Sequence, residues 1–527
     1  MTTGRDNGAP APAPEPEPAP SGATVEREIK FRLPEGGSAG PLREAVESAG
    51  FRLEPAGTLA HGDRYLDTED WALYRAGIAL RLRSESEAVR LEAKTIASAG
   101  CTALERTEWA QDAPAGDPPW TSLPPGPIAA LLQPLAGLHV LERLAVRAGI
   151  HNDRECFRWL RGETLLGSLT VDRVSAPPST FQEVEVELEN GSEEALGEVR
   201  RAVEERLGLQ QSVETKLAAA LTARGERLPE RDEHAFALHP ADRLLDVAHK
   251  TIGRHLGRLL WHEPGVRLGI DPEHVHDMRV ASRRLRVALD VLQDGISEAA
   301  REEFATHLRW IGRGLGRVRD LDVAMARLGP LEAEGPRLER PAIHVFAQSL
   351  AIRRAERRLR LIERLDSERF VNFVVGARAW VEAGPPPATS APNGGAPAYA
   401  VGAAVVARFM EAMREAYEAA ERSLSTADLH ALRIAAKQAR YAIEFFAEPG
   451  GPATTRRARR LAGLQDYLGD HRDAESLLRR MKRYVRTIPK KDRELLMSAG
   501  SAMGHLERSI RIRRADLRVA WERAMEE

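Results

Sequence analysis

Residues 25–31, VEREIKF, alternate charged and apolar side chains with a period of two. In an extended strand alternate side chains point to opposite faces, so Glu26, Glu28 and Lys30 share one face. On a solvated face this row would be ordinary surface. Inside a closed sheet, two carboxylates and an ammonium would be buried together, which is costly unless a metal ion or a polyphosphate neutralises them.

The same alternation recurs along the first 225 residues. Residues 181–189, FQEVEVELE, place Glu183, Glu185 and Glu187 on one face and valines on the other. Further strand-like stretches are 78–83, 88–95, 103–110 and 168–174, with the same-face charged pairs Arg81/Arg83, Glu92/Lys94 and Arg106/Glu108. A surface strand pair explains any one of them. An antiparallel barrel with a polar tunnel, its apolar outer face covered by helices near residues 40–50 and 192–207, explains all of them.

Composition limits the protein classes open to this chain. Its 527 residues suffice for about three or four domains. No apolar run approaches the roughly 18 residues of a membrane span, and the first residues lack the hydrophobic core of a signal peptide. Two cysteines, Cys101 and Cys156, cannot form a cysteine-based zinc site. We therefore expect a cytoplasmic protein without a membrane partner.

Charge is distributed unevenly behind a net charge of −2. Residues 1–230 carry a net charge of −12 and residues 231–527 a net charge of +10. An acidic first part favours carboxylates that bind cations, and a basic second part favours a polyanionic partner, although solvated surfaces explain either imbalance.

Lysine is rare beside arginine, with 8 lysines against 68 arginines. This skew is typical of coding composition, so the number of arginines is weak evidence for phosphate binding. The lysines within residues 1–225 are Lys30, Lys94 and Lys216. A retained lysine indicates a position where a compact ammonium cannot be replaced by a planar guanidinium.

The chain divides into segments of different composition. Residues 1–23 alternate Ala, Pro and Glu and predict a disordered tail. Residues 24–225 form the α+β, strand-rich segment, and 226–239 a polar linker. Residues 240–520 have helical periodicity, and a Pro/Gly/Ala loop at 383–397 divides them into two repeats of similar length, about 240–382 and 398–520.

The helical repeats also match in sequence. The pattern His276-x-x-Arg279-x-x-x-Arg283-x-x-Arg286 recurs 154 positions later. The second copy consists of His430, Arg433, Lys437 and Arg440. A second match, LGRVRDLDV at 315–323 with LGDHRDAES at 468–476, has an offset of 153 and supports an internal duplication. Each four-residue set spans an arc of about 80° on a helix, so four cations share one face.

The motifs of the first segment, in this order, resemble the CYTH or triphosphate tunnel metalloenzyme family. They are ExExK at 26–30, YLDT at 65–68, LRLR at 80–83, EAKT at 92–95, RTEW at 106–109, VD at 171–172 and EVEVE at 183–187, followed by Lys216. Lys216 stands in SVETK, where the family usually has a Ser-Lys pair.

The CYTH resemblance implies an eight-stranded tunnel that binds a triphosphate with Mg²⁺ or Mn²⁺. The implied metal ligands are Glu26, Glu28, Glu183, Glu185 and Glu187. The implied substrate ligands are Lys30, Arg81, Arg83, Lys94, Arg106, Arg154 and Lys216, with Arg147 as the alternative to Arg154. Glu26, Glu28, Lys30 and Lys94 are the implied catalytic residues, and the general base is left to a metal-polarised water ordered by the glutamates.

The two rows of four cations on one helix face, which we call the cation stripes, and the RD pairs at 319–320 and 472–473 resemble the CHAD domain. This resemblance implies two pseudo-symmetric four-helix bundles with a basic cleft that binds inorganic polyphosphate. The implied ligands are His276, Arg279, Arg283, Arg286, Arg319, His430, Arg433, Lys437, Arg440 and Arg472. A metal role for His276 or His430 is the weaker alternative, since their neighbours are cations.

Together the two resemblances imply a triphosphatase, acting on inorganic tripolyphosphate, with a polyphosphate-binding domain attached. Thiamine triphosphatase, nucleoside triphosphatase and adenylate cyclase activities of the same fold remain open. A non-catalytic protein that binds polyphosphate and associates with polyphosphate granules is the alternative of another class. Nucleic acid is a poorer partner, because few aromatic side chains are available for stacking on bases.

Overall fold

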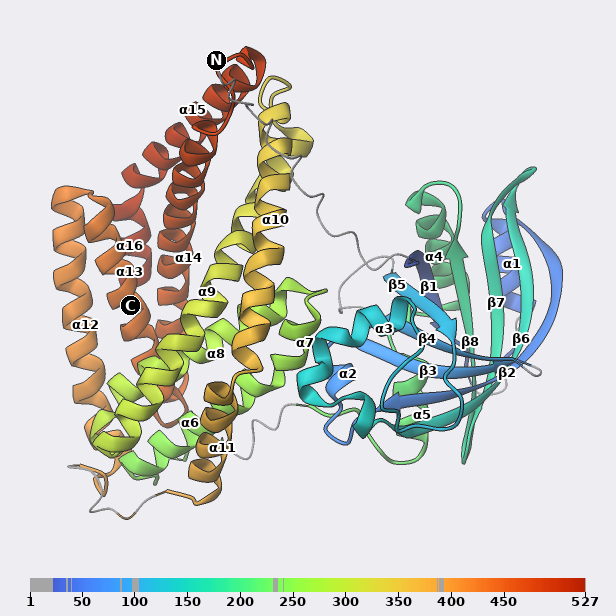
Figure 1. Cartoon of the computed structure of the whole chain (residues 1–527), viewed down its shortest axis with the longest axis horizontal. Helices are drawn as coiled ribbons and strands as arrows, with labels where there is room; N and C mark the ends of the chain where they lie inside the picture. Colours follow the sequence, from blue (N-terminus) through green and yellow to red (C-terminus); the bar gives the residue numbers. More distant parts are fainter. Residues whose placement is uncertain are drawn as a thin grey trace, which may run out of the picture. The chain divides into compact units, whose positions relative to one another are not determined.

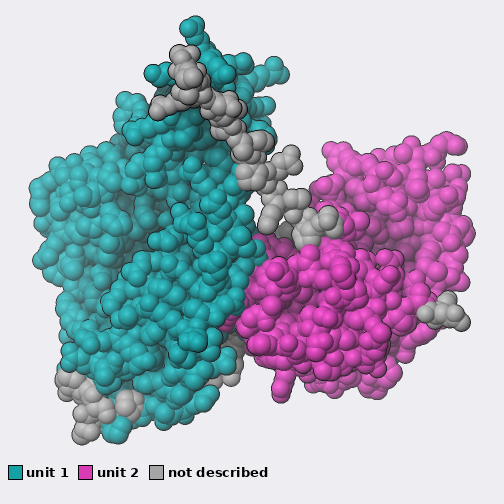
Figure 2. Space-filling view, viewed as in Figure 1, with its two compact units in different colours: residues 1–17, 231–261, 272–527 teal, residues 18–230, 262–271 magenta. Residues whose placement is uncertain are grey.

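The computed structural model describes residues 22–34, 37–38, 40–85, 88–96, 104–230, 236–239, 241–385, 387 and 393–526, without the side chains of 104, 399 and 447–454. Residues 1–21 of the expected tail, Cys101 and part of the expected linker lie outside the described residues. The chain divides into two compact units (Figure 2). The tunnel unit extends to Glu230 and includes His262–Asp271, and the helical unit contains the other described residues after it.

The tunnel unit is a closed barrel of antiparallel strands in the order β1-β5-β4-β3-β2-β6-β7-β8 (Figure 1). The strands are β1 (Thr24–Arg32), β2 (Arg52–Asp67), β3 (Ile78–Glu85), β4 (Ala88–Thr95), β5 (Leu104–Asp112), β6 (Ala145–Arg161), β7 (Thr164–Ala176) and β8 (Ser179–Leu188). The predicted antiparallel barrel is confirmed. Pairing of β1 with β8 places Lys30 opposite Glu185 and Glu28 opposite Glu187, so the charged faces of both strands meet inside the barrel.

The outer face of the barrel is apolar and is covered by short helices. These are α1 (Gly40–Ser48), α2 (Ala72–Arg75), α3 (Pro127–Leu132), the 3₁₀ turns Gln133–Leu138 and Leu141–Arg143, and α4 (Glu193–Leu207). Ile29 and Val186, which alternate with the charged rows, pack in one core with Leu42 of α1 and Val199 of α4. Burying a side chain of this kind contributes about 1.5–3 kcal/mol, so the alternation determines which face turns inward.

Two further helices complete the tunnel unit. Helix α5 (Lys216–Ala223) packs Leu217, Ala220 and Leu221 against Ile150 and Val174, both inward positions of the barrel. Helix α7 (Glu263–Leu268) belongs to this unit, although in the sequence it stands between α6 and α8 of the helical unit. Its Leu268 joins the core that covers β3 and β4.

The helical unit consists of two sets of helices. The first contains α6 (Leu244–Trp261), α8 (Pro272–Val291), α9 (Glu298–Glu334), α10 (Arg340–Leu365) and α11 (Glu368–Glu382). The second contains α12 (Ala398–Ser423), α13 (Thr426–Phe445), α14 (Ala447–Val485), α15 (Arg493–Ala515) and α16 (Leu517–Met525). Helices α8 and α13 are both 20 residues long and begin 154 positions apart, as the duplication predicts. Each half has four long helices and a shorter fifth one.

Packing joins the two halves of the helical unit in one body. Helix α8 contacts α13 and helix α9 contacts α14, and one core combines α9 and α10 with α14 and α15. The corresponding helices of the two repeats therefore meet face to face. Among the described residues, no helix is both long and apolar enough to cross a membrane.

Candidate functional site

The tunnel unit contains a cavity of about 160 Å³ lined by inward side chains of the barrel and by the start of α5. All seven cations expected to bind substrate line it: Lys30, Arg81, Arg83, Lys94, Arg106, Arg154 and Lys216. Four of the five expected metal ligands, Glu26, Glu28, Glu185 and Glu187, line it too, and Glu183 is fully buried. Arg147 instead donates from Nε to the carbonyl oxygen of Asp67.

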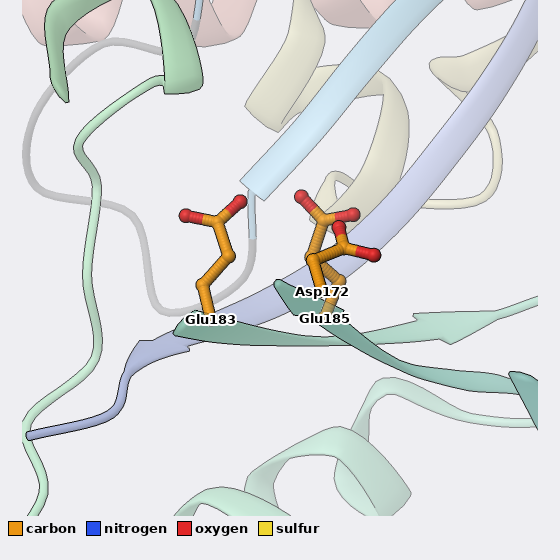
Figure 3. Close-up of side chains that lie close together, drawn as sticks. All are labelled: Asp172, Glu183 and Glu185. Carbon is orange, nitrogen blue, oxygen red and sulfur yellow. The ribbon is translucent and has the colours of Figure 1, made fainter. Parts of the chain in front are cut away.

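Three carboxylates of β7 and β8 project to one side of the two strands (Figure 3). Oxygen atoms of Asp172, Glu183 and Glu185 lie within 4.8 Å of one another. Lys216 Nζ lies 2.7 Å from Asp172 Oδ2, 2.8 Å from Glu183 Oε1 and 3.0 Å from Glu185 Oε1. An ammonium group therefore already sits where these oxygens converge.

Lys30 and Arg154 also belong to this set, the Glu183 cluster. Lys30 Nζ lies 2.7 Å from Glu185 Oε1. Arg154 donates from Nε and Nη2 to the two oxygens of Asp172, both at 2.7 Å, and from Nη2 to Glu185 at 2.8 Å. Burial alone would raise the pKa of Glu185, but Lys216, Lys30 and Arg154 hold it well below its usual range. Arg32 Nη2 also lies 3.6 Å from Glu183 Oε2, so four cations surround these three carboxylates.

A second set of paired charges, the Asp63 cluster, lies on β2, β3 and β4. Asp63 accepts two hydrogen bonds from Arg83, both at 2.9 Å, and one from Arg81 at 3.3 Å. Arg81 also donates to Glu92 at 2.8 and 3.0 Å. Burial would raise the pKa of Asp63, but the two guanidinium groups lower it to about 2. Asp63 thus fixes the orientation of both arginines in the tunnel.

The Glu26 cluster is the third set, with the carboxylates Glu26, Glu28, Glu108 and Glu187 and the cations Lys94 and Arg106. Lys94 Nζ contacts Glu26 Oε2 and lies 2.7 Å from Glu108 Oε1. Arg106 Nη1 lies 2.8 Å from Glu28 Oε1, yet this buried oxygen accepts no hydrogen bond from the described residues.

The Glu26 cluster has four carboxyl groups against two cations. Burial and its hydrogen bond with Glu108 raise the pKa of Glu26 to about 8, so this carboxyl is mostly protonated at neutral pH, and burial also raises the pKa of Glu187. Mg²⁺ and Mn²⁺ take carboxylate oxygens as ligands, and a cation bound here would displace the proton of Glu26. The Glu26 cluster offers a divalent cation the unsatisfied Glu28 Oε1, whereas the converging oxygens of the Glu183 cluster already surround Lys216.

Sequence reasoning assigned no site role to four carboxylates of the tunnel: Asp63, Glu92, Glu108 and Asp172. Glu92 and Glu108 share strand faces with assigned cations, and Asp172 stands in the VD motif, so a signal was present for all three. Asp63 lies in β2, whose alternation is interrupted by glycines.

The YLDT motif shapes the turn after β2. Asp67 is buried and accepts hydrogen bonds from the backbone N–H groups of Thr68, Leu73 and Tyr74 at 2.7–2.9 Å. Burial raises the pKa of Asp67 to about 6 despite these bonds. Tyr65 of the same motif lines the tunnel cavity.

The helical unit contains a second candidate site, a cavity of about 490 Å³ lined by residues of α8, α13 and α14. Four expected polyphosphate ligands line it: His276, Arg283, Lys437 and Arg440. Arg283 donates from Nε to the Tyr441 hydroxyl at 3.0 Å. We call this cavity and the cations beside it the basic cleft.

Further cations of the two repeats converge on the basic cleft. Burial and the positive charges of Arg472 and Arg283 lower the pKa of Arg433 to about 10. Burial, with Arg283, Arg433 and Arg472, lowers the pKa of Lys437 to about 6. Arg279 adds to both effects. Two corresponding helices of the duplicated halves thus contribute to one cluster of mutually repelling cations.

Gly316 makes room for Arg279 at the cleft. A Cβ atom at Gly316 would lie 2.0 Å from Arg279 Nη1, so the guanidinium lies directly on the backbone of α9. Arg279 Nη2 also lies 3.7 Å from Asp320 Oδ1 of the first RD pair. The glycine of the LGRVRD motif therefore has a steric role that periodicity alone does not reveal.

Other expected ligands do not line the cavity: Arg319, His430 and Arg286. Arg319 pairs with Glu273 at 3.1 Å. The pKa of His276 is lowered mainly by its own burial and next by the positive charge of Arg319. His430 is exposed, and burial, Arg433 and Arg472 lower its pKa. Arg286 is exposed and does not line the cavity.

Neither histidine joins a metal-binding group within the part of the chain that the structure describes. The one set of three His, Cys, Asp or Glu side chains with converging ligand atoms in those residues is Asp172, Glu183 and Glu185. The alternative metal role of the two histidines therefore gains no support.

Comparison with known families matches both parts of the chain. The CYTH domain model matches residues 24–221, and the CHAD domain model matches residues 250–482. No curated protein matches the sequence.

Solved structures of both kinds resemble the chain. The CHAD domain from the plant Ricinus communis is 24% identical, covering 57% of this chain and 97% of its own, with a TM-score of 0.46. A putative adenylate cyclase from Bacillus halodurans is 17% identical, covering 37% and 97%, with a TM-score of 0.26. A putative adenylyl cyclase from Hippeastrum, described as having a dominant triphosphatase activity, is 19% identical, covering 39% and 98%, with a TM-score of 0.26. The two family models show that the chain contains a CYTH domain, residues 24–221, followed by a CHAD domain, residues 250–482.

Proposed function

We propose that the tunnel unit hydrolyses a triphosphate with the help of a divalent cation, and that its preferred substrate is inorganic tripolyphosphate, cleaved to diphosphate and phosphate. The supporting observation is that seven cations and a cluster of four carboxyl groups line one small cavity inside a closed barrel. The CYTH family, to which this domain belongs, consists of triphosphate tunnel enzymes.

The cations of the tunnel would bind and align the phosphate chain. Phosphoryl transfer requires neutralised oxygens and an in-line arrangement of nucleophile and leaving group. Arg81, Arg83 and Arg154 are held by carboxylates, so their guanidinium groups are oriented before substrate binds. This arrangement reduces the loss of side-chain entropy on binding.

The Glu26 cluster would hold the divalent cation, with Glu26, Glu28 and Glu187 as ligands and Glu108 within the same set. A bound Mg²⁺ would supply charge neutralisation and lower the pKa of water. Glu183 and Glu185 act differently in this proposal, because they position Lys30 and Lys216 as phosphate ligands.

Cavity size favours a short inorganic chain. The cavity of about 160 Å³ is lined mostly by charged side chains, with Tyr65 as its aromatic ring. Pockets for drug-sized organic ligands have volumes of roughly 300–1,000 Å³ and mostly apolar linings. A nucleoside or a thiazole group would find little apolar surface inside this cavity.

The helical unit, in the same proposal, binds long-chain polyphosphate in the basic cleft. Arg283, Arg433, Lys437 and Arg472 repel one another there, as the lowered pKa values of Arg433 and Lys437 indicate. A linear polyanion would relieve this repulsion, as DNA phosphates do when they release counterions from basic proteins.

Phosphate release from a substrate panel tests the enzymatic proposal. Tripolyphosphate, thiamine triphosphate, ATP and long-chain polyphosphate are compared with Mg²⁺, with Mn²⁺ and with EDTA, while cyclic AMP is measured in parallel. We expect the highest kcat/KM for tripolyphosphate and no turnover in EDTA. Binding of polyphosphate without release of phosphate from any substrate would instead support a non-catalytic polyphosphate-binding protein.

A further inference from the structure

Helix α9 carries a second row of cations that does not line the basic cleft. Arg309, Arg313 and Arg317 are four residues apart, so they share one face of the helix. Arg319 lies two residues further, or about 200° around the helix axis, and acts on His276 of the cleft. One helix therefore presents cations in two different directions.

Two neighbouring helices add arginines to this row around Trp310 of α9. Helices α9, α10 and α11 contact one another (Figure 1). Arg364 of α10 donates from Nη1 to the backbone carbonyl of Trp310 at 2.9 Å. The guanidinium carbons of Arg364 and Arg369 lie 5.3 and 4.6 Å from the centre of the Trp310 ring. Cation–π contacts of this kind hold the two side chains in place. We call Arg309, Arg313, Arg317, Arg364 and Arg369 the arginine ladder.

The arginine ladder forms no close ion pairs within the described residues, although the charge of Arg309 acts on Asp290. Within the described residues, none of its five members forms an ion pair with a carboxylate at 4.0 Å or less, whereas the exposed Arg414 and Arg422 of α12 pair with glutamates of their own helix. Burial and the charges of Arg317, Arg313 and Arg369 lower the pKa of Arg364. Three helices thus bring like charges together without neutralising them.

We propose that the arginine ladder is a second binding site for linear inorganic polyphosphate, separate from the basic cleft. Cations four residues apart on a helix are spaced by about 6 Å along its axis. A phosphate chain carries an anion at every link and can contact successive arginines, whereas a single phosphate reaches only one or two. The Trp310 ring is engaged by two guanidinium groups, which disfavours it as a stacking platform for nucleic-acid bases. The proposal extends polyphosphate binding by the helical unit and does not require the cleft to bind.

Charge reversal in the full-length protein tests the ladder. The ladder variant is Arg313→Glu with Arg317→Glu, both exposed positions. Its matched control, Arg414→Glu with Arg422→Glu, makes the same change in net charge at exposed positions of α12. A cleft variant, Arg279→Glu with Arg433→Glu, is measured beside them. Labelled long-chain polyphosphate is titrated into each protein at low and moderate salt, and circular dichroism checks folding.

We expect the ladder variant to bind long-chain polyphosphate about tenfold more weakly than the control variant, with a shallower salt dependence. Tripolyphosphate hydrolysis should be unchanged in it. The neutral variant Arg313→Gln with Arg317→Gln should lose an intermediate amount of polyphosphate affinity. Such a graded loss follows the charge removed, whereas a folding defect would not follow the charge.

Each outcome separates the ladder from the cleft. Loss in the ladder variant with normal binding by the cleft variant would support the ladder and contradict the proposed cleft. Equal affinities of the ladder and control variants would overturn the ladder. Tighter, ladder-dependent binding of single-stranded RNA than of polyphosphate would overturn the assigned ligand.

Discussion

Lysines of the tunnel occupy positions where several carboxylates converge on one point. Lys216 Nζ has three carboxylate oxygens at 2.7–3.0 Å, and Lys94 lies between Glu26 and Glu108. A compact ammonium fits such a position, while a planar guanidinium suits the two-oxygen contact that Arg154 makes with Asp172. The rarity of lysine therefore identified positions of distinct geometry, a distinction that the number of arginines could not make.

Glutamine substitution distinguishes the two acidic clusters. Glu28→Gln should raise the Mg²⁺ concentration for half-maximal activity by at least about tenfold, because it removes a charged ligand without changing side-chain size. Glu183→Gln should raise KM for tripolyphosphate and leave the Mg²⁺ requirement unchanged, because Glu183 positions Lys216. Titrations of Mg²⁺ at saturating substrate measure both effects. An unchanged Mg²⁺ requirement in Glu28→Gln, or a raised one in Glu183→Gln, would contradict the assignment.

Lys437 predicts a pH dependence of polyphosphate binding. With a pKa of about 6 in the free protein, its amine is mostly neutral at pH 7, and a bound polyanion would raise this pKa. Binding at pH 7 should therefore take up about one proton, and affinity should increase as pH falls towards 6. His276, His430 and Asp473 titrate at the same cleft, and acid makes each more positive as well.

Calorimetry in buffers of different ionisation enthalpy measures this proton uptake. Lys437→Arg is the matched variant, because a guanidinium stays charged near neutral pH. This variant should take up fewer protons on binding polyphosphate, and its affinity should depend less on pH. Equal proton uptake by the wild type and Lys437→Arg would assign the effect to the histidines and refute the role of Lys437.

Six strands of the barrel follow from period-two alternation, but β2 and β6 do not. Pro55, Gly57 and Gly62 interrupt the pattern of β2, and its pairing with β6 shifts register between Pro55 and Gly57. These two strands pair along nearly their whole length, so each is stabilised by its partner more than by a local pattern. Asp63 was missed for the same reason.

In the helical half, the duplicated cation stripes predicted which helices correspond. They could not predict that α8 and α13 contact each other, because this contact depends on tertiary packing.

Gly316 of helix α9 gives a prediction at the scale of helix packing. Gly316→Ala should displace the Arg279 guanidinium and weaken polyphosphate binding by about tenfold, because a charged contact is lost. Stability should change little, since the atom that must move is the end of a flexible side chain. Gly463→Ala in α14 is the control: apart from its own helix backbone and chain neighbours, no atom of the described residues lies within 4 Å of its added Cβ, and we expect about 0.5–1 kcal/mol of stabilisation. Thermal unfolding and polyphosphate titration measure both variants, and normal binding by Gly316→Ala would refute the steric role.

Charge is segregated between the two ends of the chain, at −12 up to residue 230 and +10 after it. The acidic end keeps its excess charge partly inside a closed cavity, while many cations of the basic end lie on exposed helix faces. Buried pairs are screened much less by salt than exposed charges are.

Salt should therefore affect the two proposed activities differently in the intact protein. Polyphosphate affinity should fall steeply between low and moderate ionic strength, because many phosphate contacts release counterions. The kcat of tripolyphosphate hydrolysis should change little over the same range. Salt series of both quantities on one preparation check this, and parallel losses would contradict the assignment of long-chain binding to the exposed helices.

Leu268 of α7 lies beyond the span that the CYTH model matches, yet it belongs to the same hydrophobic core as Leu73 of α2 and Leu135. A genetic fusion that transplanted only residues 24–221 to another protein would leave this leucine behind and expose the apolar surface it covers. The segment that must be inherited together for a complete tunnel domain is thus longer than the segment that family resemblance delimits. If evolution moved the tunnel domain into another protein, the segment between α6 and α8 would have to move with it. Otherwise Leu73 and its neighbours would have to be replaced by polar residues.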